Sequence, residues 1–208
     1  MYRPGAFAVD DLAAIHQVIR TRVFATIAAA QGGKVALGYA PVVLDAENGP
    51  HGGVRFHFAM RNRLAELQDG DRVHLSVLAA DAYVSPDWYR STVTVPTWNY
   101  VAVEGEGGVK RLSRDELRQL VLDLSDQEEA KLAPKPPWKV DKVPEARIEA
   151  MLNIIVGFSL SFETLEGKFK LSQDKHADDI AGAIEGLRER SDSTSLATAA
   201  AMEKRGAL

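Results

Sequence analysis

Aromatic side chains are concentrated in one short stretch of this sequence, residues 83–100. The stretch holds two of the three tryptophans and three of the five tyrosines, with small polar residues and prolines between the rings: Tyr83, Ser85, Pro86, Trp88, Tyr89, Pro96, Thr97, Trp98, Asn99 and Tyr100. Flat apolar rings beside fixed hydrogen-bonding groups suit a planar ligand. Tyr83, Ser85, Trp98 and Asn99 are the candidates to line such a site. Taken singly, each tryptophan is more often a core or interface anchor.

A second segment, residues 166–173, supplies positive charge. It reads Glu-Gly-Lys-Phe-Lys-Leu-Ser-Gln and places Lys168, Lys170 and Gln173 at the end of an expected strand. It is not a phosphate-binding P-loop, because Phe162 stands where that motif needs glycine and Phe169 follows the lysine. Together, the two segments favour a planar ligand with an anionic tail. Flavin mononucleotide (FMN) has that shape.

His57, Arg61 and Asn62 form a third candidate group. His57 alternates with Phe56 and Phe58, on the polar side of an expected strand. It could donate to a phosphate or a ring carbonyl, or equally form a cross-strand hydrogen bond at a barrel rim. Arg61 and Asn62 follow where the strand turns into a short helix, and backbone N–H groups and a guanidinium both suit phosphate oxygens there. Alone, Arg61 is more often a solvated surface residue.

The composition excludes several classes of function. The chain has no cysteine, which removes disulfides and thiolate chemistry, and its other histidines lack metal-ligand spacing, so no metal is expected. A formal net charge of −4 does not support direct DNA contact. The N-terminus lacks the pattern of a signal peptide, and no apolar run could span a membrane. We therefore expect a soluble, cytoplasmic protein.

Hydrophobic periodicity predicts short strands with few helices. Strands are expected over residues 23–30, 35–44, 54–59, 73–84 and 101–103, and a further strand starting over residues 158–163 carries the 166–173 segment at its far end. Helices are expected over residues 12–19, 113–124, 144–155 and 180–187. The Ser113/Glu116 spacing is that of a capping box. Gly105-Glu106-Gly107-Gly108 is interpreted as a hairpin turn.

This order favours a mainly β (α+β) fold, a small antiparallel Greek-key barrel with peripheral helices. Residues 1–190 are assigned to one domain. Residues 191–208 are assigned to an Ala-rich C-terminal tail with little to bury, either frayed or a loosely docked helix.

The sequence resembles the PaiB-type FMN-binding negative transcriptional regulators. The segments that carry the likeness are Met1-Tyr2-Arg3-Pro4, His57-Phe58-Ala59 with Asn62, 82–89 (Ala-Tyr-Val-Ser-Pro-Asp-Trp-Tyr), 95–100 (Val-Pro-Thr-Trp-Asn-Tyr) and 166–173. The resemblance implies a split barrel similar to that of pyridoxamine-phosphate oxidases and flavin reductases. It also implies a homodimer that holds FMN in a cleft made by both subunits.

By position, the resemblance places His57, Arg61 and Asn62 near the phosphate and ribityl chain. It places Tyr83, Ser85, Trp98 and Asn99 near the flavin ring, and Lys168, Lys170 and Gln173 at the far rim or on the partner subunit. One departure is Arg61-Asn62-Arg63, where related chains often carry Ala-Asn-Pro. Two arginines there would favour an anion or signal a shifted loop.

Three functions remain open at this point. The first is a regulator in which FMN is a sensor or structural cofactor. The second is an FMN-dependent oxidoreductase acting on an unidentified small substrate, because a bound flavin carries the redox chemistry. The third is a flavin-free interaction module whose aromatic cluster forms a dimer interface. Whether the protein is an enzyme is left undecided by the sequence.

Overall fold

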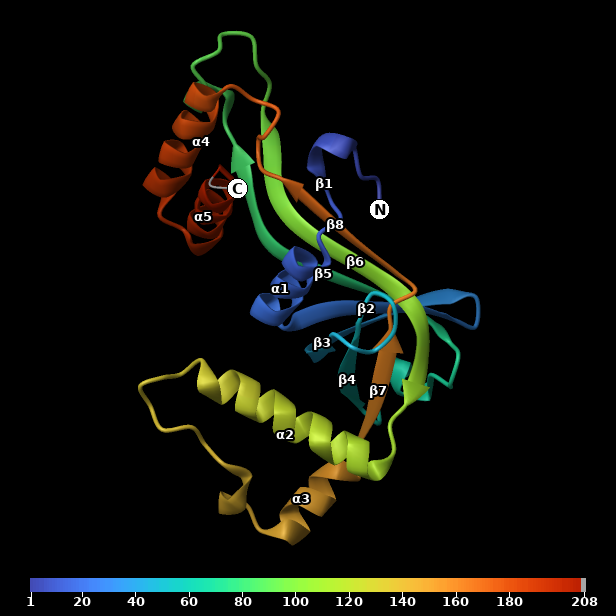
Figure 1. Ribbon diagram of the computed structural model, residues 1–208. Coiled ribbons are helices and arrows are strands. Elements are labelled where there is room, and N and C mark those ends of the chain that lie inside the picture. The colour runs from blue at the N-terminus through green and yellow to red at the C-terminus, as the bar shows by residue number, and fades with distance from the viewer. Residues whose placement is uncertain (207–208) are drawn as a thin grey trace. The chain divides into compact units, whose positions relative to one another are not determined.

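The computed structural model describes residues 1–206 (Figure 1). Its strands are β1 (Ala8–Val9), β2 (Phe24–Gln31), β3 (Lys34–Asp45), β4 (Gly53–Ala59), β5 (Arg72–Val84), β6 (Thr97–Arg111), β7 (Ile155–Ser161) and β8 (Thr164–Lys170). Its α-helices are α1 (Leu12–Arg22), α2 (Arg114–Ala130), α3 (Glu145–Leu152), α4 (Ala177–Arg190) and α5 (Ser193–Gly206). Four short 3-10 helices are η1 (Gly5–Phe7), η2 (Arg63–Glu66), η3 (Pro86–Trp88) and η4 (Val140–Lys142). Of the helices described, none is long and apolar enough to cross a membrane.

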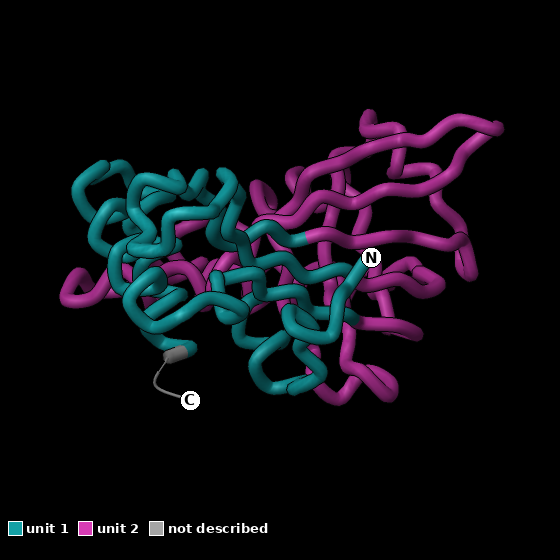
Figure 2. The backbone as a smooth tube through the Cα atoms, turned by 90° about the horizontal axis from the view of Figure 1, so that it is seen from above, with its two compact units in different colours: residues 1–18, 77–104, 166–208 teal, residues 19–76, 105–165 magenta. Residues whose placement is uncertain are grey.

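The chain divides into two compact units, shown in different colours in Figure 2. Unit 1 comprises residues 1–18, 77–104 and the chain from residue 166 onward, and unit 2 comprises residues 19–76 and 105–165. Strands β5 and β6 each contribute residues to both units.

Unit 2 is an antiparallel barrel. Strand β2 pairs with β3 and β5, β3 with β4, β4 with β7, and β7 with the end of β6. Backbone hydrogen bonds from Gly70 N to Val109 O (2.8 Å) and from Val109 N to Asp71 O (3.0 Å) join β6 to the start of β5 and complete the ring. The rings of Phe56, Phe58 and Phe158 pack against one another inside the barrel. The antiparallel split-barrel prediction is confirmed.

The predicted hairpin turn at residues 105–108 is wrong. These residues lie inside β6, which continues without a break from Thr97 to Arg111. A Cβ on Gly105 would lie 2.6 Å from the Phe162 ring, and a Cβ on Gly107 would collide with the Ser161 backbone carbonyl. The glycines therefore mark positions where other groups approach the strand closely, which glycine permits in a strand interior.

Helix α2 packs on the outside of the barrel through an apolar stripe. Its Ser113 N-cap accepts a hydrogen bond from Glu116 N at 3.3 Å, and Glu116 Oε2 accepts one from Ser113 N at 2.7 Å, which confirms the capping box. Buried Leu117 and Leu120 meet Val43 of β3 and Leu152 of α3. Figure 1 shows α2 and α3 as neighbours at the start of β7.

Unit 1 is a ladder of β1, β8, β6 and β5 with helices on one face. In this order the strands are hydrogen-bonded neighbours. A core cluster joins sheet and helix side chains: Ala82, Val84, Tyr89, Val101, Leu171, Ala183, Leu187, Ala199 and Met202. Trp88 fits against Gly182 and Gly186 of α4, where any side chain would collide with it.

The segment assigned from composition to a tail forms α5. Ala199 and Met202 are buried in the unit 1 core, and Ser195 and Thr198 are fully buried. The expectation that this segment has little to bury is corrected, because small side chains allow the helix to pack closely. Residues 207–208 of the assigned tail lie outside the described residues.

Candidate functional site

Aromatic and cationic side chains gather on the face of the unit 1 sheet that points away from the core. Along β6, Asn99 and Val101 are buried while Trp98 and Tyr100 alternate with them, and along β8, Phe169 packs on the core between Lys168 and Lys170. We call this surface the aromatic–lysine face, and it consists of Asp81, Tyr83, Trp98, Tyr100, Lys168 and Lys170.

Trp98 is the centre of the aromatic part of this face. Its Nε1 donates a hydrogen bond to Asp81 Oδ2 at 3.1 Å, and its ring meets the Tyr83 ring edge-on with centroids 6.0 Å apart. Trp98 is nevertheless 50% exposed and Tyr83 37% exposed. Two oriented, solvent-facing rings offer an apolar surface to a planar partner.

Lys168 supplies a buried cation on the same face, beside the rings of Tyr100 and Tyr2. Its Nζ lies 5.2 Å from the Tyr100 ring centroid and 5.3 Å from that of Tyr2, and it donates to Tyr2 O at 3.0 Å. The residue is only 9% exposed. A buried ammonium normally has an anionic partner. Across residues 1–206, however, Lys168 forms no ion pair.

Lys170 lies two residues further along β8. Its Nζ donates to Thr97 Oγ1 (2.5 Å) and Trp98 O (2.7 Å) and lies 5.9 Å from the Phe7 ring centroid. Burial lowers the pKa of Lys170, and the charges of Lys168 and Lys175 lower it further, while Asp174 opposes them. The main cause of the lowered pKa is burial, which disfavours the charged ammonium. An anion bound beside Lys170 would favour the charged form and so offset this effect.

The N-terminal segment also lies on this face. Tyr2 and Phe7 place their rings next to Lys168 and Lys170, Gln173 Nε2 donates to Ala6 O at 3.0 Å, and β1 pairs with β8. Tyr2, Phe7 and Tyr100 are not among the site residues predicted from the sequence. The Met1-Tyr2-Arg3-Pro4 likeness was the available signal for the first of these.

Three of the polar candidates in unit 1 have partners within the chain. Asn99 is fully buried, where its Nδ2 donates to Ser172 Oγ at 2.9 Å. Ser85 caps η3 and accepts from Asp87 N at 3.3 Å. Gln173 fixes the turn after β8 by accepting from Leu171 N at 2.6 Å. These contacts position the aromatic–lysine face and account for each residue without a ligand.

His57, Arg61 and Asn62 belong to unit 2, whereas the other seven predicted residues belong to unit 1. His57 points to the same side of β4 as Arg55, whose Nη2 bonds Asp123 of α2 at 2.8 Å. The buried His57 Nδ1 atom has no hydrogen-bond partner among residues 1–206, and desolvation lowers the pKa of the imidazole. Neutral imidazole is therefore the form favoured at neutral pH.

Arg61 and Asn62 precede a single short turn. Arg61 is exposed, and Asn62 Oδ1 accepts from Leu64 N at 2.9 Å as the N-cap of η2. The Asn62 side chain thus uses the capping position that an anion would need. That arrangement gives Asn62 a structural role, whereas Arg61 is an exposed surface cation.

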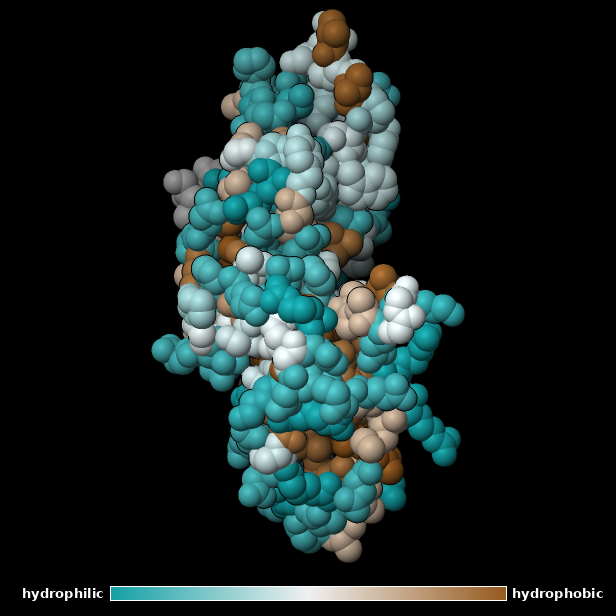
Figure 3. Space-filling view, turned by 90° about the vertical axis from the view of Figure 1, so that its right-hand side faces the viewer, coloured by the Kyte–Doolittle hydropathy of each residue, from teal (hydrophilic) through white to brown (hydrophobic). Residues whose placement is uncertain are grey.

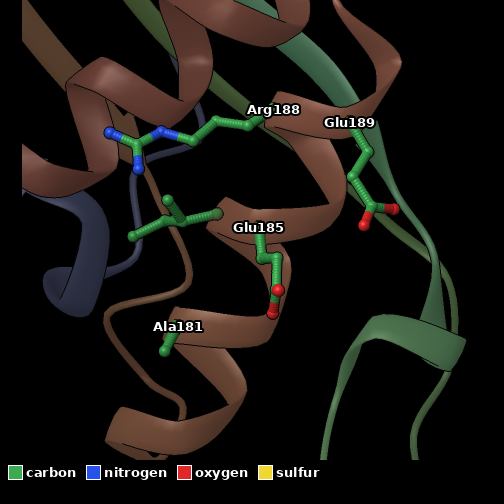
Figure 4. Close-up of a pocket in the computed structure, with 5 residues that line it drawn as sticks. Ala181, Glu185, Arg188 and Glu189 are labelled. Atoms are coloured by element: carbon green, nitrogen blue, oxygen red, sulfur yellow. The ribbon is translucent and has the colours of Figure 1, made fainter.

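Neither the pocket found on α4 nor a search for metal-binding clusters adds a candidate ligand site. A shallow hollow on the outer side of α4 is lined by Ala181, Ile184, Glu185, Arg188 and Glu189 (Figure 4) and includes none of the predicted residues. In the part of the chain that the structure describes, no group of three His, Cys, Asp or Glu side chains could hold a metal ion.

Comparison with known proteins identifies the family. Residues 1–164 match the model of the family described as "Putative FMN-binding domain". The chain belongs to this FMN-binding domain family. It is also 28% identical over 204 residues to the protease synthase and sporulation protein PAI 2 of Bacillus subtilis, covering 98% of this chain and 97% of that protein. The predicted PaiB-type likeness is confirmed, and FMN, the predicted cofactor, is the one for which the family is described.

Solved structures confirm the fold. The FAD and heme binding protein of Mycobacterium smegmatis superposes with a TM-score of 0.58 at 16% identity, covering 85% of this chain and 79% of that one. The flavocytochrome Anf3 of Azotobacter vinelandii gives a TM-score of 0.54 at 16% identity, covering 81% and 72%. At such identities the likeness establishes the split-barrel fold of the FMN-binding domain and nothing about individual residues.

Proposed function

We propose that this protein is an FMN-binding regulator of the PaiB type that holds its flavin against the aromatic–lysine face. The observation that carries the proposal is the buried Lys168 side chain, whose ammonium group lacks an ion-pair partner among the described residues and lies beside the rings of Tyr2 and Tyr100. Family membership supplies the identity of the ligand.

The residues present fit the two halves of FMN. Lys168 and Lys170 can neutralise a phosphate, since within the described part of the chain both ammonium groups bond only neutral oxygens. Trp98 and Tyr83 offer apolar ring surface to a flat heterocycle. When bound, FMN supplies a redox-active ring, which the protein needs only to bind, orient and tune.

Pairing of two copies belongs to the proposal, and an exposed apolar row in unit 2 supports it. Side chains on one side of the β2–β3 hairpin are largely solvent-facing: Phe24 (60% exposed), Val35 (70%), Leu37 (57%) and Tyr39 (61%). Isolated exposed apolar residues are ordinary, but a contiguous row on a sheet is typical of an interface. Figure 3 shows how hydrophobic side chains reach the surface between hydrophilic ones on one face. A two-fold pair through this row would be self-complementary.

The regulatory role is proposed to act without direct DNA binding. The net charge of −4 provides no general attraction to a polyanion. The resemblance to PaiB-type negative transcriptional regulators, together with the full-length likeness to the Bacillus PAI 2 protein, supports a regulatory role. A protein partner would then distinguish the flavin-bound form from the flavin-free form. The cytoplasmic location inferred from the sequence stays a prediction.

An FMN titration followed by absorbance and protein fluorescence tests the proposal. Saturable binding is expected for the wild type, and Lys168→Gln should bind more weakly while keeping its melting temperature. Lys110→Gln, which alters an exposed lysine of unit 2, is the matched control. An absence of FMN binding would overturn the proposal. Turnover of NAD(P)H by the loaded protein would instead favour the oxidoreductase.

Sedimentation of a Leu37→Asp variant tests the pairing. The wild type should sediment as a dimer, and a charge in the centre of the apolar row should shift it to the monomer. Val93→Asp changes a residue that is 96% exposed outside this row and should leave the dimer intact. A wild-type monomer, or a dimer that survives Leu37→Asp, would refute this interface.

A further inference from the structure

Tyr2 covers the ammonium group of Lys168. The tyrosine is 84% exposed, the lysine is 9% exposed, and the Nζ atom lies 5.3 Å from the Tyr2 ring centroid. The Tyr2 carbonyl accepts the one hydrogen bond that Lys168 Nζ donates within residues 1–206, at 3.0 Å. The Lys168 ammonium is therefore covered and hydrogen-bonded by Tyr2, a solvent-facing residue of the N-terminal segment.

The occupant is a weak partner for a buried charge. A neutral carbonyl and two ring faces, Tyr2 and Tyr100, solvate the ammonium without neutralising it. The acid on the same side of β8, Glu166, is already bonded to the α-amino group of Met1 at 2.5 Å and lies 3.9 Å from Arg3. An incoming anion would accept the ammonium's hydrogen bond and also neutralise its charge, which the Tyr2 carbonyl cannot do.

Met1, Arg3 and Ala6 have attachments that do not involve Lys168. Arg3 Nη1 bonds Val9 O (3.1 Å) and Asp10 (2.5 Å), and Ala6 O accepts from Gln173 at 3.0 Å. Tyr2 itself is joined to unit 1 through Lys168 in the interactions described. Tyr2 can thus leave Lys168 while the neighbouring residues stay in place. The movement would uncover the Lys168 ammonium together with the Tyr100 ring.

We propose that Lys168 is a gated anion site, at which a phosphate monoester replaces the Tyr2 carbonyl and displaces the Tyr2 ring. Naming the ligand as FMN rests on the proposed function, whereas the exchange at Lys168 does not. The gate makes the position of Tyr2 depend on ligand occupancy, so that binding is reported at the exposed surface of the N-terminal segment.

Affinities for FMN and riboflavin, which lacks the phosphate, test the gate in three variants. Tyr2→Ala should tighten FMN binding about two- to fivefold, the range of one exposed cation–π contact, and leave riboflavin binding unchanged. Tyr2→Phe keeps the ring and the carbonyl and should match the wild type. Lys168→Gln should remove the preference for FMN over riboflavin. Weaker FMN binding by Tyr2→Ala would make Tyr2 a ligand contact and overturn the gate.

Backbone hydrogen exchange with inorganic phosphate separates this inference from the proposed function. Saturating phosphate should speed exchange at residues 2 and 3, the amides next to the moving Tyr2, in the wild type but not in Lys168→Gln, and should leave residues 5–8 unchanged in both proteins. Equal exchange in both proteins, with and without phosphate, would overturn the gate even if FMN binds. Faster exchange in a protein that binds no FMN would support the gated anion site and refute the flavin proposal.

Discussion

The Asn99 amide donates a hydrogen bond to Ser172 Oγ at 2.9 Å and joins β6 to the turn after β8 from inside unit 1. Asn99 is fully buried and Ser172 is 3% exposed. Ser172 has a φ of +61°, so its backbone is held in a conformation that few non-glycine residues adopt. The side-chain contact thus supports the turn that ends the lysine-bearing strand.

Replacing Asn99 by alanine should lower the stability of the protein and have little effect on its affinity for FMN. The change leaves the buried Ser172 hydroxyl without its partner, which costs about 1–3 kcal/mol. Chemical denaturation measures this loss. Asn153→Ala, an exposed asparagine of unit 2, should change stability little. Normal stability of Asn99→Ala with lost FMN binding would instead make Asn99 a direct ligand contact.

Trp98→Phe should weaken FMN binding while preserving stability. Phenylalanine keeps an aromatic ring but loses the hydrogen bond to Asp81 that orients the indole. Loss of an oriented aromatic contact predicts about two- to tenfold weaker binding. Fluorescence titration gives the affinity, and Trp138→Phe in the loop of unit 2 is the control. If both variants bind FMN like the wild type, the aromatic–lysine face is not the flavin site.

Much of the fold could be predicted from the sequence because the local signals agree with the final structure. The capping box at Ser113 and Glu116 begins α2 as expected, and the alternation of Val54, Phe56 and Phe58 marks β4. For Gly105 and Gly107 the predicted turn is wrong, because glycine is typical both of turns and of strand positions that another group approaches closely. Only the position of Phe162 and the Ser161 carbonyl, distant in sequence, decides between them.

For the candidate site, the sequence indicates which residue types gather on one surface better than it indicates what each side chain contacts. Lys168, Lys170, Tyr83 and Trp98 were selected and share one face of unit 1. Asn99 was also selected, but the period of two along β6 turns it toward the core. Tyr2 was missed as a site residue because its contact with Lys168 joins residues 166 positions apart. Sequence spacing carries no information about such a contact.

Gly105→Ala should destabilise the barrel, since the new methyl group would meet the Phe162 ring at 2.6 Å. Overpacking of this kind costs about 1–3 kcal/mol. Gly108→Ala is the matched control in the same strand, where the nearest atom to a new Cβ is 3.6 Å away. Urea midpoints of the two variants should therefore differ clearly. Equal midpoints would show that Phe162 moves aside without cost.

Asp179 should make stability depend on pH in the acid range. Its buried carboxylate accepts hydrogen bonds from Ser91 Oγ (2.7 Å), Ser91 N (2.9 Å) and Arg90 N (2.7 Å), which tie the loop after η3 to α4. These bonds, that from the Ser91 hydroxyl first, hold the pKa of Asp179 below its ordinary value of 3.8. A carboxyl whose folded pKa is lowered contributes fully above its unfolded pKa and loses that contribution as the pH falls through the folded pKa.

Asp179→Asn should therefore be less stable than the wild type near neutral pH, and the difference should shrink as the pH falls below about 4. Denaturant midpoints measured across this range give the comparison. Asp178→Asn alters the exposed neighbouring acid and should follow the wild-type curve. A difference between Asp179→Asn and the wild type that stays constant with pH would mean that shape alone, and not the ionised carboxylate, holds the Arg90–Ser91 loop on α4.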